Sequence, residues 1–333
     1  MTTNNSSLRI GIIGVGAFGT RIGLQFRALP EVTVVALADV SDEALRMAGD
    51  RLGVRTDARY SEYGQLLHDE SLNAVVVATP HTLHYEQITA ALDRDLHVLS
   101  EKPLVVDGDQ ARELRSRAAS SEQVLMVGYQ RHLDTAFRRV RDRYTDGPAI
   151  THVTAEIASD WIRSFAGTWR TDHDLSAGGL MTDTGRHVID AVLWTTGLEP
   201  TTVRAEMEFA EPGIERFGEL SLTFDGEARA SIVAVGTASS VRETYHFWDA
   251  EGGVRVFGRG WGPREFVRVD TDGGEYSPEI DRSTEQTKAE AFVAAVLHDE
   301  PLPATPRDAV QAQSVIEAAY ESVRSNKRIN INI

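Results

Sequence analysis

The strongest constraint on the fold is an alternation of short apolar runs with helix-forming segments over residues 1–130. The apolar runs are unbroken, which is typical of strands buried on both faces of a parallel sheet. The expected strands are Leu8–Ile13, Val32–Ala38, Asn73–Ala78, His97–Leu99 and Val124–Tyr129. The expected helices are Phe18–Leu29, Asp42–Leu52, Tyr63–Leu67, Leu83–Arg94 and Asp109–Ala119. This order predicts an α/β domain with a parallel, helix-covered sheet.

From residue 131 onward the apolar residues alternate with polar ones, which indicates strands exposed on one face. A helix at Thr135–Tyr144, a strand at Thr151–Ala158, a polar loop at Asp160–Gly179 and a helix at Leu180–Thr195 come first. The later strands are Thr202–Phe209, Gly218–Phe224, Ala228–Val235, Glu243–Trp248, Gly253–Phe257 and Glu265–Val269, followed by helices Thr284–His298 and Arg307–Ser325. We therefore predict two domains, 1–130 and 131–333, the second with a predominantly antiparallel sheet. Whether the C-terminal helix packs back on the first domain stays open.

A glycine motif, G-x-G-x-x-G, spans Gly14 to Gly19 between the first expected strand and helix. Gly14 would form the turn, Gly16 would let a pyrophosphate approach the backbone, and Gly19 would allow close helix–strand packing. The helix N-terminus attracts negative charge. The second expected strand ends at Asp39, whose carboxylate would accept hydrogen bonds from a ribose and repel a 2′-phosphate. We predict dinucleotide binding by Gly14, Gly16, Ala17, Phe18, Gly19 and Asp39, with NAD favoured over NADP. The alternative is a Rossmann unit with only a structural role.

Composition and charge exclude several classes of partner. The formal net charge of −16 argues against nucleic acid and anionic membranes as partners. The chain has no cysteine, no signal-peptide pattern and no apolar run long enough to cross a bilayer, so we expect a cytoplasmic protein. Of the 34 basic residues only Lys102, Lys288 and Lys327 are lysines. An acidic, lysine-poor chain fits either a halophilic source or a GC-rich genome.

The position of Lys102 is informative because lysine is so scarce. Glu101-Lys102-Pro103 directly follows the expected strand His97–Leu99, at the sheet edge where open α/β sheets bind ligands. Taken alone, Lys102 is better explained as a solvated turn residue.

Together these motifs resemble the Gfo/Idh/MocA family, named for glucose–fructose oxidoreductase and inositol dehydrogenase. The resemblance rests on the glycine motif, Ala78-Thr79-Pro80 with His84, Glu101-Lys102-Pro103, Val127–Arg131 and Gly178–His187, and it extends over essentially the whole chain. His81 departs from the asparagine that many members have at this position.

The resemblance implies a Rossmann domain followed by an α/β domain with an open, mixed sheet, through which members commonly form dimers or tetramers. It implies that Lys102 faces the substrate and that Asp183 and His187 belong to the catalytic set. It also implies that Thr79, Pro80, His84 and Glu101 line the nicotinamide ribose.

The chemistry of Asp183 and His187 supports this assignment independently. The two residues are four apart on an expected helix and would share one face. A carboxylate on one ring nitrogen would leave the other free to take a proton from an alcohol, and histidines titrate near neutral pH. A surface ion pair is the alternative for this spacing. We expect no metal, since no histidine–carboxylate ligand motif is present beyond this pair.

Aromatic and arginine side chains are candidates for contact with a carbohydrate or polyol. They are Tyr129, Arg131, Trp169, Arg170 and His173. Trp161 is equally well explained as a core residue.

The predicted reaction is reversible hydride transfer between a nicotinamide and a CH–OH carbon of a sugar, polyol or sugar derivative. His187 would remove the hydroxyl proton and Lys102 would stabilise the reacting oxygen. Which of the two finally accepts the proton stays open. An NAD-assisted glycoside hydrolase and a non-catalytic NAD- or sugar-binding regulator are the alternatives.

Overall fold

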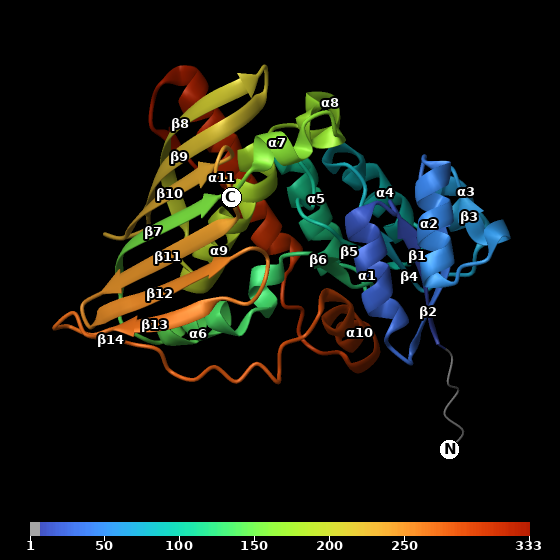
Figure 1. Cartoon of the computed structure of the whole chain (residues 1–333), viewed down its shortest axis with the longest axis horizontal. Coiled ribbons are helices and arrows are strands. Elements are labelled where there is room, and N and C mark those ends of the chain that lie inside the picture. The colour runs from blue at the N-terminus through green and yellow to red at the C-terminus, as the bar shows by residue number, and fades with distance from the viewer. Residues whose placement is uncertain (1–6) are drawn as a thin grey trace. The chain divides into compact units, whose positions relative to one another are not determined.

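A computed structural model describes residues 7–333, and this part of the chain divides into two compact units (Figure 1). Unit 1 comprises the chain up to Val105, Asp109–Gly128 and Gln286–Pro306. Unit 2 comprises Val106–Gly108, Tyr129–Glu285 and Arg307–Ile333. The segment 286–306 therefore belongs with the N-terminal part of the chain despite its distance in sequence.

Unit 1 contains a six-stranded sheet in the order β3-β2-β1-β4-β5-β6. All its strand pairs are parallel. The strands are β1 (Leu8–Ile13), β2 (Val32–Ala38), β3 (Arg59–Tyr60), β4 (Ala74–Val77), β5 (His97–Ser100) and β6 (Leu125–Val127). The helices are α1 (Ala17–Arg27), α2 (Asp42–Leu52), α3 (Tyr63–Asp69), α4 (His84–Leu92), α5 (Gly108–Ala119) and α10 (Lys288–His298), with 3₁₀ turns η1 (Thr56–Ala58) and η2 (His81–Leu83). This order is that of the doubly wound dinucleotide-binding fold, which confirms the prediction for this part of the chain.

Local signals explain why the elements of unit 1 begin and end where they do. All four residues of β4 are buried, as the unbroken apolar run predicts. Helix α2 begins after Ser41, whose side chain accepts a hydrogen bond from the Ala44 backbone N–H at 3.3 Å. It ends at Gly53, which has a φ of +74°, a conformation that glycine adopts without strain. Such caps place the α2 boundaries where the sequence predicts them.

Unit 2 contains a nine-stranded mixed sheet in the order β14-β13-β12-β11-β7-β10-β9-β8-β15. The strands are β7 (Ile150–Ala158), β8 (Pro200–Glu211), β9 (Ile214–Phe224), β10 (Arg229–Val235), β11 (Arg242–Asp249), β12 (Gly252–Arg259), β13 (Glu265–Val269), β14 (Glu275–Tyr276) and β15 (Ile329–Asn330). The pair β7–β10 is parallel and the other pairs are antiparallel. The expected open, predominantly antiparallel mixed sheet is confirmed.

Helices pack against one side of this sheet, namely α6 (Thr135–Thr145), α9 (Arg186–Thr196) and α11 (Pro306–Ser325) (Figure 1). Unit 2 also contains η3 (Gln130–Leu133), α7 (Trp161–Phe165), η4 (Trp169–Thr171), α8 (His173–Ser176) and η5 (Met181–Gly185). The core of unit 2 combines apolar residues of α6, α9 and α11 with alternate residues of the strands. In β10, for example, Ala230, Ile232 and Ala234 are buried. The period-two pattern thus reflects one covered face and one uncovered face.

Two expectations for unit 2 differ from the structure. The expected loop Asp160–Gly179 contains three short helices, α7, η4 and α8. The expected continuous helix Leu180–Thr195 begins as a π-helix, η5, before continuing as α9. Within residues 7–333, no helix is both long enough and apolar enough to cross a bilayer.

Candidate active site

The glycine motif of unit 1 forms a turn with an exposed tip. Gly14 has a φ of +86°, and a Cβ there would lie 2.7 Å from the Ala78 carbonyl. A Cβ on Gly19 would meet the Gly14 carbonyl oxygen, so both glycines permit close packing. Gly16 is exposed, and a Cβ on it would meet nothing within 4 Å. Gly16 is also the N-cap of α1 and supplies no side-chain cap, so the N-terminal N–H groups of α1 are not capped by it.

Asp39 joins this turn to the end of β2. Its Oδ2 accepts a hydrogen bond from the Val15 backbone N–H at 2.8 Å, and its Oδ1 accepts one from the Ser41 N–H at 2.9 Å. Asp39 is half-buried, and a carboxylate oxygen can accept more than one hydrogen bond. The carboxylate is thus fixed beside the glycine turn and can still accept bonds from a ligand hydroxyl.

The turn after β4 and the segment after β5 are connected by His84. The His84 ring is fully buried, with Nδ1 2.7 Å from the Pro103 carbonyl oxygen and Nε2 2.9 Å from the Thr79 carbonyl oxygen. Burial lowers the pKa of His84, although the two carbonyls favour the protonated ring. Thr79 and Pro80 are half-buried, and Thr79 Oγ1 donates to Gln87 Oε1 at 2.6 Å. The buried His84 ring therefore connects the Thr79–Pro80 turn to Pro103 through their backbone carbonyls, and its place beside a ribose stays a prediction.

Glu101 is held by a lysine that is distant in the sequence. Lys288 Nζ, at the start of α10, donates to Glu101 Oε1 at 2.5 Å, and both residues are buried. The capping box of Thr287 and Glu290 fixes the first turn of α10 and therefore the position of Lys288. Lys102 directly follows Glu101 in the chain and is half-exposed. Two of the three lysines are thus associated with one buried carboxylate, Lys102 as its neighbour in sequence and Lys288 as its bonded partner.

In unit 2, the motif at Gly178–His187 is organised around Glu215. This carboxylate, fully buried, accepts hydrogen bonds from the backbone N–H groups of Gly179, Met181 and Thr182 at 2.9, 2.8 and 3.3 Å. Tyr320 donates its hydroxyl to the same carboxylate at 2.9 Å. Burial raises the pKa of Glu215, whereas these donors oppose the increase. Glu215 therefore fixes the backbone at the start of η5, and π-helical turns frequently mark functional sites.

Asp183 lies in η5 and is 5% exposed. Its Oδ2 accepts hydrogen bonds from Trp161 Nε1 at 2.8 Å and from Arg170 Nε at 3.2 Å. The Arg170 Cζ lies 4.3 Å from the centre of the Trp169 ring, which fixes the guanidinium between an aromatic face and the carboxylate. Trp161 is a buried residue with its indole N–H on Asp183, so it serves both the core and the site.

His187 is in the first turn of α9 and is 7% exposed. Because η5 is a π-helix, Asp183 and His187 are not separated by the regular α-helical turn that the four-residue spacing predicts. Their direct pairing stays a prediction. The His187 ring centre lies 6.0 Å from that of Trp261.

The remaining candidates for substrate contact differ in exposure. Trp169 and Arg170 are half-exposed and His173 is exposed. Tyr129 and Arg131 are 1% and 2% exposed. The Tyr129 ring stacks on His132, and burial raises the pKa of its hydroxyl. A direct substrate contact is therefore easier to assign to Trp169, Arg170 and His173, and all five assignments stay predictions.

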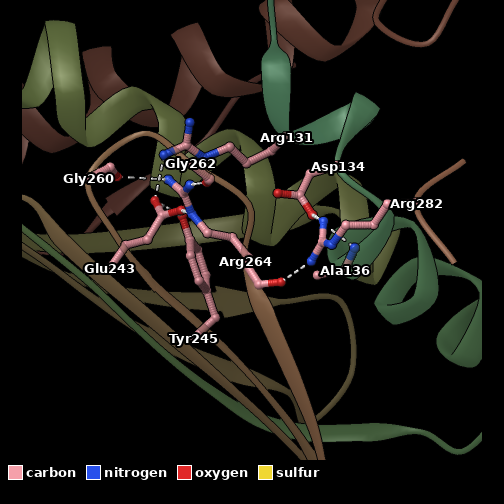
Figure 2. Close-up of polar contacts among 9 residues, drawn as sticks. All are labelled: Arg131, Asp134, Ala136, Glu243, Tyr245, Gly260, Gly262, Arg264 and Arg282. Atoms are coloured by element: carbon pink, nitrogen blue, oxygen red, sulfur yellow. Dashed lines mark hydrogen bonds and ion pairs between the residues drawn. The ribbon is translucent and has the colours of Figure 1, made fainter. Parts of the chain in front are cut away.

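Arg131 takes part in a buried ionic group that the sequence patterns did not indicate. Its Nη2 donates to Glu243 Oε2 at 2.5 Å, and Glu243 Oε1 accepts from Arg264 Nε (Figure 2). Glu243 lies on the same buried face of β11 as Tyr245. A charged residue at an apolar position of a strand is the feature of the sequence that could have indicated this ionic group. Glu215 and Lys288 gave no comparable signal, because their partners are distant in sequence. Among residues 7–333, no group of three or more histidines and carboxylates could hold a metal ion.

Two family models match the chain. The model described as an oxidoreductase family with an NAD-binding Rossmann fold matches residues 8–129, and the GFO/IDH/MocA C-terminal domain model matches residues 137–258. The glycine turn, Asp39 and Glu101-Lys102-Pro103 lie in the first match, and Asp183, His187 and Glu215 lie in the second.

Similar proteins cover nearly the full length of the chain. The rhizopine catabolism protein MocA of Rhizobium meliloti is 26% identical over 94% of each chain. The D-xylose 1-dehydrogenase (NADP(+)) 2 of Haloferax volcanii is 25% identical over 98% of this chain and all of its own. The crystal structure of scyllo-inositol dehydrogenase from Lactobacillus casei with NAD(H) and scyllo-inositol has the same fold, with a TM-score of 0.81 and 22% identity over 97% of this chain and 99% of that one. The chain therefore belongs to the Gfo/Idh/MocA family of NAD-binding oxidoreductases.

Proposed function

We propose that the protein is an NAD-dependent dehydrogenase that transfers a hydride between nicotinamide and a CH–OH carbon of a sugar or polyol. The observation that carries the proposal is the segment Asp183–His187 of unit 2, in which a carboxylate with two fixed donors precedes a histidine of low exposure. The names of similar proteins, among them a D-xylose 1-dehydrogenase and an inositol 2-dehydrogenase, support the substrate class.

Unit 1 fits the cofactor in two respects. Exposed Gly16 leaves space at the N-terminus of α1 that a pyrophosphate would fill, and the helix end supplies N–H donors. Asp39 offers carboxylate oxygens to the adenosine ribose and would repel a 2′-phosphate, which favours NAD over NADP. When bound, the nicotinamide would supply the hydride acceptor or donor. Thr79, Pro80 and Glu101 would hold the ribose beside it, with His84 and Lys288 fixing their positions.

The acid–base roles belong to His187 and Lys102. We assign to His187 the removal of the hydroxyl proton during oxidation and its return during reduction. Lys102, as a cation, would donate a hydrogen bond to the reacting oxygen and stabilise its developing negative charge. Asp183, whose carboxylate accepts hydrogen bonds from Arg170 and Trp161, would provide a negative charge in a fixed position near His187.

The test compares Lys102→Ala, His187→Ala and Asp183→Asn with two matched controls, Lys327→Ala and His298→Ala, which alter exposed residues. We expect kcat of the first two variants to fall by about two or more orders of magnitude, the scale of general acid–base and electrostatic contributions. Asp183→Asn should also lower kcat, whereas the controls should not.

The affinity for NAD and the melting temperature are measured on the same variants. Affinity for NAD should persist in the variants, because the adenosine half of the cofactor is assigned to other residues. Near-normal kcat in all three variants on a verified substrate would show that this site is wrongly assigned. Lowered melting temperatures with unchanged turnover per folded molecule would show that these residues are structural.

A further inference from the structure

One large aromatic side chain beside His187 is exposed. Trp261 lies in the loop between β12 and β13 and is 48% exposed, whereas His187, whose ring centre is 6.0 Å away, is 7% exposed. A single exposed apolar residue is ordinary on a protein surface and carries no functional meaning by itself. The position of Trp261 is different because its loop is fixed and its neighbour is the proposed base.

The loop that carries Trp261 is bonded on both sides of the tryptophan. The Arg264 guanidinium donates to the carbonyl oxygens of Gly260, at 3.5 Å, and of Gly262 (Figure 2). Arg264 is itself 2% exposed and is paired with the buried Glu243. Arg282 donates to the Arg264 backbone carbonyl, which fixes the start of β13 as well. An exposed hairpin loop is thus attached to the buried interior of unit 2 by one arginine.

The buried guanidinium of Arg131 contacts the ring of Trp261. Its Cζ lies 5.5 Å from the centre of the Trp261 ring, within the range of a cation–π contact. Arg131 is 2% exposed and is held by Glu243 Oε2 at 2.5 Å. One carboxylate, Glu243, therefore fixes both the arginine that anchors the loop and the arginine that lies beside the indole.

Such a fixed indole suits a carbohydrate ring. Sugar and polyol rings present apolar C–H groups on their faces and hydroxyls around their edges. An indole face can bury the C–H groups, and a nearby histidine can reach an edge hydroxyl. A rigid aromatic residue also loses little conformational entropy when it binds.

We infer that Trp261 is the residue on which the ring face of the substrate packs, held beside His187 by the buried Arg131–Glu243–Arg264 group. This inference rests on the proposed function and extends it, since it names a determinant of affinity for ring-shaped polyols and sugars. Packing on Trp261 places the ring, and His187 acts on its hydroxyl.

The test compares Trp261→Ala and Trp261→Phe with Leu297→Ala. Leu297 is 41% exposed and lies in the last turn of α10, so it is a control for the loss of an exposed apolar side chain away from the sheet. The KM and kcat are measured with NAD+ for myo-inositol, scyllo-inositol, D-xylose and D-glucose. The same four compounds are titrated by calorimetry into protein saturated with NADH, in which an alcohol cannot be oxidised.

We expect Trp261→Ala to raise the KM and the calorimetric Kd about tenfold, which corresponds to about 1.4 kcal/mol of binding free energy. The kcat should change much less, Trp261→Phe should keep most of the affinity, and Leu297→Ala should match the wild type. Turnover with a KM that Trp261→Ala leaves unchanged would overturn the inference and leave the proposed function intact.

Failure of the proposed function can also be distinguished from failure of the inference about Trp261. Binding that depends on Trp261 without formation of reduced cofactor would support the inference and overturn the proposed function. No binding and no turnover of any of the four compounds would overturn both. A change only in melting temperature or in molar mass by light scattering would assign Trp261 to stability or to a subunit contact, which also overturns the inference.

Discussion

Replacing Glu243 by glutamine should destabilise unit 2 strongly. Glu243 is the one carboxylate between two arginines, with Arg131 Nη2 at 2.5 Å from Oε2 and Arg264 Nε on Oε1, and all three side chains are at most 2% exposed. A neutral glutamine in its place would leave two buried guanidiniums without an anion. Breaking a buried ion pair from one side costs roughly 3–5 kcal/mol of unfolding free energy. At about 2–4 °C per kcal/mol for a unit of this size, the melting temperature should fall by about 10 °C.

The assay is thermal unfolding of the wild type, Glu243→Gln and a matched control, Glu227→Gln. Glu227 is an exposed residue of the loop between β9 and β10, and its replacement should change the unfolding free energy by less than about 0.5 kcal/mol. Glu243→Gln should also raise the KM as Trp261→Ala does, because the loop loses its anchor. A melting temperature within a few degrees of the control would refute the energetic role assigned to Glu243.

The pH dependence has a defined sign. Burial acts to raise the pKa of Glu243, but Arg131 and Arg264 outweigh burial and lower it below the ordinary 4.5. A carboxylate with a lowered pKa contributes stability above its unfolded-state pKa and loses that contribution as the pH falls through its folded-state pKa. The difference in stability between wild type and Glu243→Gln should therefore be full at neutral pH and shrink below about pH 4.5. A difference that grows on acidification would contradict the assignment.

Three further predictions concern the cofactor and the assembly. Gly16→Ala should preserve the melting temperature, because its Cβ meets no protein atom within 4 Å, and should weaken NAD binding measured by calorimetry. Gly14→Ala should lower the melting temperature, because its Cβ would lie 2.7 Å from backbone atoms at a φ of +86°. Unchanged NAD affinity in Gly16→Ala would contradict the cofactor site. The ratio of kcat/KM should favour NAD+ over NADP+ about tenfold or more and should fall in Asp39→Ala, and a clear preference for NADP+ in the wild type would overturn the role assigned to Asp39. Light scattering at micromolar concentration should give a dimer or tetramer, because one face of the unit 2 sheet has no helical cover; a monomer would count against this.

The fold of unit 1 was predictable because its signals are local. Unbroken apolar runs mark buried parallel strands, and Ser41 and Gly53 cap α2 at the expected residues. The two-residue strands β3, β14 and β15 are too short to produce a periodic pattern. The place of α10 in unit 1 also gave no local signal, since it depends on contacts such as Lys288 with Glu101, which are 187 residues apart.

The candidate site was predictable in its residues but not in its geometry. The motif Gly178–His187 indicated Asp183 and His187. The π-helix, however, depends on Glu215, a residue of β9 whose carboxylate accepts hydrogen bonds from three backbone N–H groups of the motif. Short helices in the loop 160–179 are fixed by tertiary contacts, among them the bond from Trp161 to Asp183. Propensity and periodicity describe the chain locally and cannot report such partners.

The most direct test of the proposed activity is the formation of reduced nicotinamide when the wild-type protein is incubated with NAD+ or NADP+ and a panel of sugars and polyols. We expect a steady increase in the absorbance of the reduced cofactor with at least one ring polyol or aldose, larger with NAD+, and its loss in His187→Ala. Release of an aglycone from a glycoside without net formation of reduced cofactor would contradict the proposed activity and indicate an NAD-assisted hydrolase. Binding of NAD or sugar with neither reaction would contradict it in favour of a regulator.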